Sequence, residues 1–229
     1  MDPFQKAKRL NVRGVFWNDM VSLETKFLIG MMELQYGKNV VPQLKKLSGN
    51  ISWAQGWPEE KRAFWNGEAF MWNHKIERAT REVIHNELMV LREGKNLDLG
   101  CGAYSYVPSV GFDISPKMLQ FNEQCTERVV GDIEEGLPFS DSSFDSVTAV
   151  FLLNYVKNYS LLMNEVYRVL KQKGVFVGVI SAQGVNEWQK QKEVTTLLIE
   201  EWKNVLQEVG FSTRSEEKEK LWFLWGKKR

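Results

Sequence analysis

The sequence has few cysteines and no long hydrophobic run. Its 229 residues include two cysteines, Cys101 and Cys125, at a spacing that fits neither a zinc site nor a disulfide framework. No apolar stretch approaches the roughly 20 residues that cross a bilayer, and the N-terminal MDPFQKAKRL has no apolar segment of the secretory type. We therefore expect a cytoplasmic protein with reduced thiols, no membrane span and no metal site.

A strong charge of either sign is also missing, since the formal net charge is +1. Such a chain has no field that would steer nucleic acid toward it, so nucleic acid is not an expected partner. The sequence has no Walker loop, no Gly-x-Ser-x-Gly elbow and no His-Glu-x-x-His pair. The only histidines are His74 and His85; without a visible partner residue, each is interpreted as a surface or boundary side chain rather than a general base.

What the sequence does contain is a strand and glycine turn at its centre. Residues 96–99 (NLDL) predict a buried strand that enters Gly100-Cys101-Gly102, where two residues lack a Cβ and a ligand can approach the backbone. Residues 109–112 predict a second strand, which ends at Asp113. In an open α/β sheet the carboxyl ends of such strands adjoin, and a carboxylate there can accept both hydroxyls of a ribose. The pattern predicts a nucleoside site.

Several blocks follow this centre in a fixed order. They are Gly131-Asp132-Ile133, Leu137-Pro138-Phe139, Ser143-Phe144-Asp145-Ser146-Val147, residues 164–171 (NEVYRVLK) and Gly174-Val175-Phe176. In order and spacing, the series resembles class I S-adenosylmethionine-dependent methyltransferases of the UbiE-like type. The resemblance implies an α/β, Rossmann-like fold with a seven-stranded, mostly parallel sheet and a C-terminal antiparallel hairpin, here with an N-terminal helical extension. It also implies methyl transfer from S-adenosylmethionine, leaving S-adenosylhomocysteine, to an acceptor that we expect to be a small molecule.

The same resemblance implies a set of cofactor-binding residues. Asp113 would accept from the ribose and Asp132 from the adenine amino group, while the N–H of Ile133 would meet a ring nitrogen. Trp72 stands in the aromatic segment before the first strand, where its indole either faces the sulfonium or packs in the core. The full set is Trp72, Asp98, Gly100, Cys101, Gly102, Tyr104, Asp113, Ile114, Asp132, Ile133 and Phe151.

The sequence departs from the family between the first two strands. Only residues 100–108 connect them, and a helical crossover needs at least about 10 to 12 residues. Pro108 also disfavours helix at Val107. We therefore predict that the first helix is absent or reduced to a turn. We further expect Tyr104, Tyr106 and the N-terminal helices to fill the gap and to contact the amino-acid end of the cofactor.

The chain is expected to divide into a helical, substrate-side cap over residues 1–92 and the cofactor domain over residues 93–229. Five of the nine tryptophans precede the cofactor domain and either build a helical core or line a substrate chamber; they are Trp17, Trp53, Trp57, Trp65 and Trp72. Residues 5–13 carry a basic run interpreted as a solvated face, and residues 183–188 are interpreted as an active-site rim. Later in the chain, a helix over 161–170 is predicted to close at Gly174.

The candidate catalytic residues follow the fourth predicted strand. Asn154 or Tyr155 could orient the methyl acceptor, although Tyr155 could equally only pack. The run at 151–155 lacks the Asn/Asp-Pro-Pro-aromatic motif of enzymes that methylate base or amide nitrogens. The sequence leaves open a non-catalytic binding protein with this fold and a methyltransferase that acts on protein or RNA. It disfavours a nicotinamide-dependent enzyme, because the full Gly-x-Gly-x-x-Gly fingerprint is missing, and it leaves the oligomeric state open.

Overall fold

The computed structural model describes residues 21–182, 190 and 192–229, apart from the side chains of Asn73 and His74. The basic run at 5–13, Trp17 and the rim at 183–188 lie outside the described residues. The chain forms two compact units, Met1–Phe70 and Met71–Arg229. Each unit is described by itself below.

The first unit is helical and has an aromatic core. Its elements are α3 (Leu23–Gln35), α4 (Val41–Ser48), η1 (Ser52–Ala54) and α5 (Lys61–Glu68). The ring of Phe27 meets Trp53 and Trp57 edge to face, with centroids 5.6 and 5.5 Å apart, and Trp57 is almost fully buried. Edge-to-face pairs are a favourable aromatic arrangement. The interpretation of these tryptophans as core is confirmed for Trp57; their role as a substrate-side cap stays a prediction.

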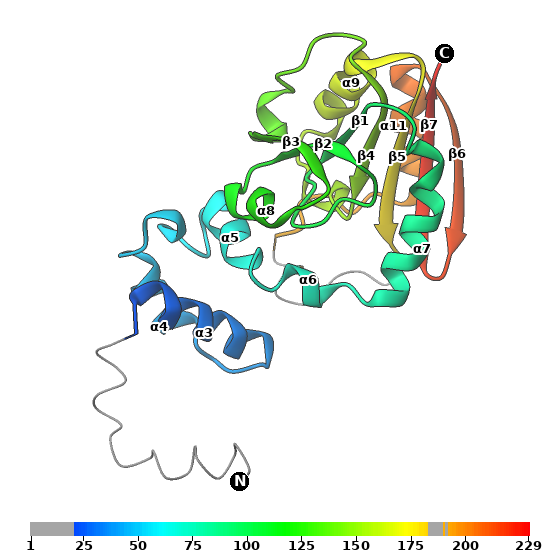
Figure 1. The fold of residues 1–229 in the computed structure, drawn as a ribbon. Coiled ribbons are helices and arrows are strands. Elements are labelled where there is room, and N and C mark those ends of the chain that lie inside the picture. The colour runs from blue at the N-terminus through cyan, green and yellow to red at the C-terminus, as the bar shows by residue number, and fades with distance from the viewer. Residues whose placement is uncertain (1–20, 183–189, 191) are drawn as a thin grey trace, which may run out of the picture. The chain divides into compact units, whose positions relative to one another are not determined.

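The second unit is built on a seven-stranded sheet with the order β3-β2-β1-β4-β5-β7-β6 (Figure 1). The strands are β1 (Asn96–Leu99), β2 (Ser109–Asp113), β3 (Cys125–Val130), β4 (Phe144–Val150), β5 (Leu170–Ser181), β6 (Phe211–Lys218) and β7 (Leu221–Lys228). The first five pair in parallel, and β7 is antiparallel to both β5 and β6. The predicted Rossmann-like sheet with a C-terminal antiparallel hairpin is confirmed.

Short helices accompany the sheet. They are α6 (Trp72–Lys75), α7 (Arg78–Leu88), η2 (Met89–Leu91), α8 (Pro116–Phe121), η3 (Ile133–Glu135), η4 (Leu153–Tyr155), α9 (Tyr159–Val169) and α11 (Ile199–Val209). Helices α9 and α11 bury their apolar residues on one face of the sheet, against β1, β2 and β4. Helix α7 packs on the other face, against β5 and β7. Because alternate strand residues point to opposite faces, both faces of β5 are covered.

The connection between β1 and β2 contains no helix, as predicted. Nine residues, 100–108, run between these parallel strands as turns and bends. Tyr106 and Val107 from this connection are buried beside α7, and Tyr104 packs against the same cluster. The Nδ1 atom of His85 on α7 lies 3.1 Å from the carbonyl oxygen of Tyr106. His85 is thus a surface histidine with a partner, which agrees with the predicted surface or boundary side chain. The expectation that the N-terminal helices of the first unit also fill the gap left by the missing helix stays a prediction.

Helix α9 ends differently from the prediction. Asn158 caps its first turn by accepting from the N–H of Leu161 at 3.2 Å, but Leu170 is already extended, and the chain continues directly into β5. The left-handed residue is Lys173, with φ of 64°, so Gly174 is not the helix cap. Gly174 is required for another reason, because a Cβ there would lie 2.8 Å from the carbonyl oxygen of Lys171.

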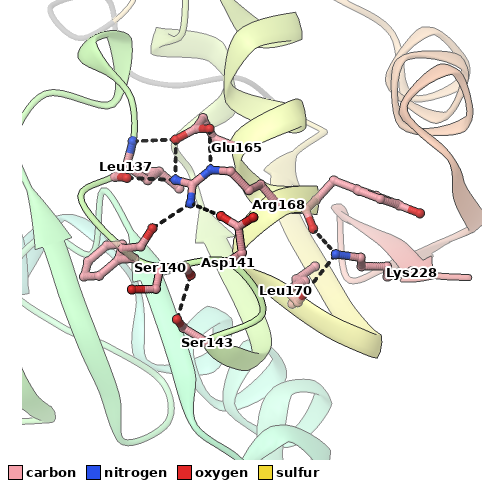
Figure 2. Close-up of polar contacts among 10 residues, drawn as sticks. Leu137, Ser140, Asp141, Ser143, Glu165, Arg168, Leu170 and Lys228 are labelled. Atoms are coloured by element: carbon pink, nitrogen blue, oxygen red, sulfur yellow. Dashed lines mark hydrogen bonds and ion pairs between the residues drawn. The ribbon is translucent and has the colours of Figure 1, made fainter.

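Arg168 of α9 fastens the loop before β4 to the helix (Figure 2). Its guanidinium donates to the carbonyl oxygens of Leu137 and Phe139, at 2.9 and 2.6 Å. It also pairs with Glu165 at 2.7 Å and Asp141 at 2.8 Å. The planar, multidentate guanidinium can serve all four groups at once, which an ammonium cannot. Arg168 is therefore the side chain with the most contacts to this loop, and Glu165 adds one by accepting from the N–H of Leu137 at 2.9 Å.

We predict that Arg168→Ala lowers the free energy of unfolding by about 2–3 kcal/mol, because several acceptors lose a charged donor together. Arg168→Lys should recover only a small part of this loss. Chemical denaturation measures both variants. The control is Arg78→Ala, which removes an exposed pair with Glu82 and should change stability by less than about 0.5 kcal/mol. Equal stability of Arg168→Ala and the parent protein would contradict the role given to this side chain.

Candidate nucleoside site

The glycine turn follows β1 with two left-handed residues. Gly100 and Gly102 have φ of 54° and 57°, a region that side chains with a Cβ rarely adopt. A Cβ on Gly100 would also lie 2.5 Å from the side chain of Leu152. Both backbone freedom and close packing therefore require these glycines, and the N–H of Gly102 points to a carboxylate on β2.

That carboxylate belongs to Asp113, at the end of β2. One oxygen accepts from the N–H of Gly102 at 2.9 Å and the other from the N–H of Ser115 at 2.8 Å. Desolvation by burial raises the pKa of Asp113 to about 6, against the effect of these two hydrogen bonds, which favour the ionised form. A carboxylate has about four acceptor positions. Two therefore remain for hydroxyl donors.

Asp98 of β1 is the second buried carboxylate. It accepts from the hydroxyl of Thr148 at 2.8 Å, and burial raises its pKa to about 6, while hydrogen bonds from Ser105 and Thr148 work in the opposite direction. Thr148 is also reached by the amide of Asn96 at 3.2 Å, and Ser146 donates to Asn96 at 2.9 Å. The sheet face left without a crossover helix thus carries a polar layer at β1 and β4.

A narrow pocket opens at the carboxyl ends of β1 and β4. Its lining consists of Trp72, Ile76, Asp98, Gly100, Cys101, Tyr104, Tyr106, Val150 and Phe151. In chain order the sheet grows from β1 toward β3 and then returns to place β4 on the other side of β1. The pocket lies at this reversal, which is where open α/β sheets bind ligands.

Two aromatic residues shape this pocket. The indole of Trp72 lies against Gly102, since a Cβ on that glycine would be 2.9 Å from its Nε1. Phe151 follows β4 with φ of 55°, and its N–H donates to the carbonyl oxygen of Val179 at 2.8 Å. A non-glycine residue in this region is strained, and such strain gathers at functional sites. The structure therefore brings Trp72 and Phe151 to the glycine turn.

The predicted adenine-side residues follow β3. Asp132 caps η3 by accepting from the N–H of Glu134 at 3.0 Å, Ile133 is buried, and Ile114 is half-buried beside Asp113. The N–H of Gly131 donates to the carbonyl oxygen of Asp113 at 3.0 Å. Asp132 and Asp113 therefore lie at neighbouring strand ends. Asp132, Ile133 and Ile114 do not line the narrow pocket itself.

The two catalytic candidates lie on η4. The side-chain amide of Asn154 donates to Glu193 at 2.9 Å, and its backbone carbonyl oxygen accepts from the N–H groups of Val194 and Thr195 at 2.9 and 3.1 Å. Asn154 therefore holds the chain after β5 beside the end of β4. Tyr155 is half-buried on the same short helix. Neither residue lines the pocket.

Sequence reasoning missed Asn122, the buried residue that ends α8. Its amide donates to the carbonyl oxygen of Gly102 at 3.1 Å and to the hydroxyl of Ser105 at 3.0 Å, and its oxygen accepts from the N–H of Ser105 at 3.3 Å. A helix would have satisfied these backbone groups internally. Here one side chain from a later element does so, and no spacing in the sequence signals it.

Cys101 and Cys125 are free and meet over Gly111, where a Cβ would lie 3.0 and 2.3 Å from their sulfur atoms. The hydrogen bond with Cys125, followed by burial, raises the pKa of Cys101 well above its usual value. A thiol is a poor nucleophile when its pKa is raised.

Among the described residues, no group of three or more His, Cys, Asp and Glu side chains is placed to hold a metal ion. Nor does any helix in the described ranges have the length and apolarity to cross a membrane.

The central part of the chain is similar to methyltransferase domains. Residues 97–178 match the family model described as "Methyltransferase domain", so the resemblance stated from the sequence is confirmed for this part of the chain. The chain is 32% identical over 127 residues to a demethylmenaquinone methyltransferase of Staphylococcus carnosus, which covers 48% of this chain and 51% of that protein. A Geobacillus protein of the same name is 31% identical over 121 residues, 45% of this chain and 52% of its own length. The chain thus spans about half the length of these curated relatives.

Solved structures agree in fold. A chain of the Haloferax volcanii complex between the Trm112 methyltransferase activator and a methyltransferase has a TM-score of 0.59 at 17% identity, covering 72% of this chain and 94% of its own. A SAM-dependent methyltransferase from Archaeoglobus fulgidus has a TM-score of 0.57 at 18% identity, covering 69% of this chain and 99% of its own. At these identities the likeness concerns the fold.

We predict that Asp98→Asn stabilises the protein in a pH-dependent way. The folded-state pKa of Asp98, about 6, exceeds the value of 3.8 for an unperturbed side chain, so its favourable contribution is complete below about pH 4 and is lost as the pH rises through 6. Relative to the parent, the Asp98→Asn variant should gain about 3 kcal/mol of unfolding free energy between pH 4 and pH 7. Urea denaturation across this range measures the difference. Parallel stability curves would contradict the burial of a titrating carboxylate.

Proposed function

We propose that the protein is an S-adenosylmethionine-dependent methyltransferase that acts on a small molecule in the cytoplasm. The observation that carries the proposal is the row of carboxylates at the carboxyl ends of adjoining strands: Asp98 in β1 next to its last residue, Asp113 at the end of β2 and Asp132 after β3. A nucleoside lying across this edge would place adenine at Asp132, ribose at Asp113 and the sulfur at the pocket between β1 and β4. The family match supports the same placement.

In methyl transfer from S-adenosylmethionine, the main task of the protein is to align the acceptor with the methyl group and the sulfur. The cofactor supplies a methyl group on a sulfonium, which is already activated toward a nucleophile. Holding an acceptor in line with the methyl and the sulfur can contribute up to about 7–11 kcal/mol. Phe151 lines the pocket, and η4 with Asn154 and Tyr155 follows it directly in the chain. In this proposal Asn154 and Tyr155 orient the acceptor.

For the acceptor, we propose an aromatic small molecule and take demethylmenaquinone as the first compound to test. The support is the name of the relatives in Staphylococcus and Geobacillus. A non-catalytic binding protein is the second candidate. The observation in its favour is the contact of Trp72 with Gly102, because the indole occupies the place where the backbone would approach a ligand.

We predict micromolar binding of S-adenosylmethionine and S-adenosylhomocysteine and no binding of NAD, measured by titration calorimetry. Asp113→Ala should remove detectable binding of both sulfur nucleosides, because the ribose loses its acceptor and the turn loses the partner of Gly102. Lys203→Ala, which removes a surface pair with Glu200, should leave binding unchanged. Binding of NAD, or full affinity in the Asp113→Ala variant, would refute the cofactor assignment.

We predict transfer of label from methyl-labelled S-adenosylmethionine to reduced demethylmenaquinone or to another aromatic hydroxyl acceptor. Binding of the cofactor without transfer to any small molecule in a panel, together with transfer to protein or RNA fractions, would replace the small-molecule proposal by one of the alternatives. Binding without transfer to any fraction would favour the non-catalytic candidate.

A further inference from the structure

Tyr106 is the one pocket-lining residue whose buried hydroxyl has no hydrogen-bond partner in the part of the chain that the structure describes. The residue is 5% exposed, so water does not readily serve this group. A buried hydroxyl without a partner destabilises the folded protein. Such a group is satisfied when a ligand with an acceptor enters the pocket.

The charge around the hydroxyl defines which ligand group fits. Burial keeps the pKa of Tyr106 well above its usual value, so the residue stays a neutral donor, and the positive charge of Arg81 acts in the opposite direction. The Arg81 guanidinium lies over the ring of Tyr104, 5.1 Å from its centroid. Tyr104 in turn meets Tyr106 edge to face at 5.1 Å. A neutral donor next to a cation favours an anionic oxygen.

The position of the pocket along the sheet edge indicates which group of the cofactor would reach Tyr106. With adenine and ribose assigned to the ends of β3 and β2, the amino-acid end of S-adenosylmethionine reaches the pocket after β1. The only anion of that cofactor is its α-carboxylate, and its ammonium suits the carboxylate of Asp98 on the same wall. We propose that Tyr106 and Arg81 bind the cofactor's α-carboxylate, in place of the helix N-terminus that the nine-residue connection leaves out. The inference rests on the proposed function and deepens it.

The test compares two ligands that differ only in the carboxylate. They are S-adenosylhomocysteine and its decarboxylated analogue S-adenosyl-3-thiopropylamine, each titrated calorimetrically into the full chain. Tyr106→Phe, which removes the hydroxyl alone, should weaken S-adenosylhomocysteine binding about 10- to 100-fold and leave the analogue's affinity unchanged. Arg81→Gln should show the same selectivity. Arg78→Gln is the matched control, because Arg78 lies one turn earlier on α7 with its side chain 92% exposed, and it should affect neither ligand.

A second measurement separates this role from a structural one. Because the hydroxyl has no partner among the described residues of the ligand-free protein, Tyr106→Phe should melt at the same temperature as the parent or higher, whereas loss of a structural hydroxyl would lower the melting temperature. A lower melting temperature, unchanged affinity for S-adenosylhomocysteine, or equal losses for both ligands would each overturn the inference. Binding of neither ligand by the parent protein would instead overturn the proposed function, and the inference with it.

Discussion

The constraint on which the second unit depends is the nine-residue connection between β1 and β2. Two parallel neighbours are joined by a chain too short to include a helix, so one sheet face lacks the element that would cover it. The structure covers this face with α7, packed on β5 and β7, and with Tyr106 and Val107 from the connection itself. The backbone of the connection has no helical hydrogen bonds, and Asn122 supplies partners for it from the end of α8.

The absence of a crossover helix on this face also explains why polar groups lie deep in the sheet. On β1 the apolar residues Leu97 and Leu99 point to the face of α9 and α11, while Asn96 and Asp98 point to the other. Each of these polar side chains has a partner on β4, so the layer is satisfied within the sheet. Its ionised member, Asp98, is nevertheless costly to bury. That cost is concentrated at the wall of the pocket, where a cationic ligand can offset it.

Much of this arrangement could be predicted from the sequence, for identifiable reasons. The strand periods, the glycine turn and the count of residues from Gly102 to Asp113 are local properties, and they predicted the sheet, the hairpin and the missing helix. Gly174 was assigned wrongly because a glycine after basic residues resembles a helix cap, whereas its role is to let Lys171 approach. Asn122 could not be ranked from the sequence, because its importance arises from contacts between elements far apart in the chain, which no local pattern encodes. Tyr106 was expected near the cofactor, but the sequence did not show that its hydroxyl is buried without a partner among the described residues.

With the cofactor placed as proposed, the burial of Asp98 would tie cofactor binding to proton release. In the ligand-free protein, burial holds the pKa of Asp98 near 6, and an ammonium bound beside it would lower that pKa, because an opposite charge favours the ionised form. The free protein then carries more protons than the complex at pH values near 6. By linkage, affinity for the cationic end must rise with pH through this range and level off above it. The same burial that weakens the free protein at neutral pH therefore gives the pocket its preference for a cation.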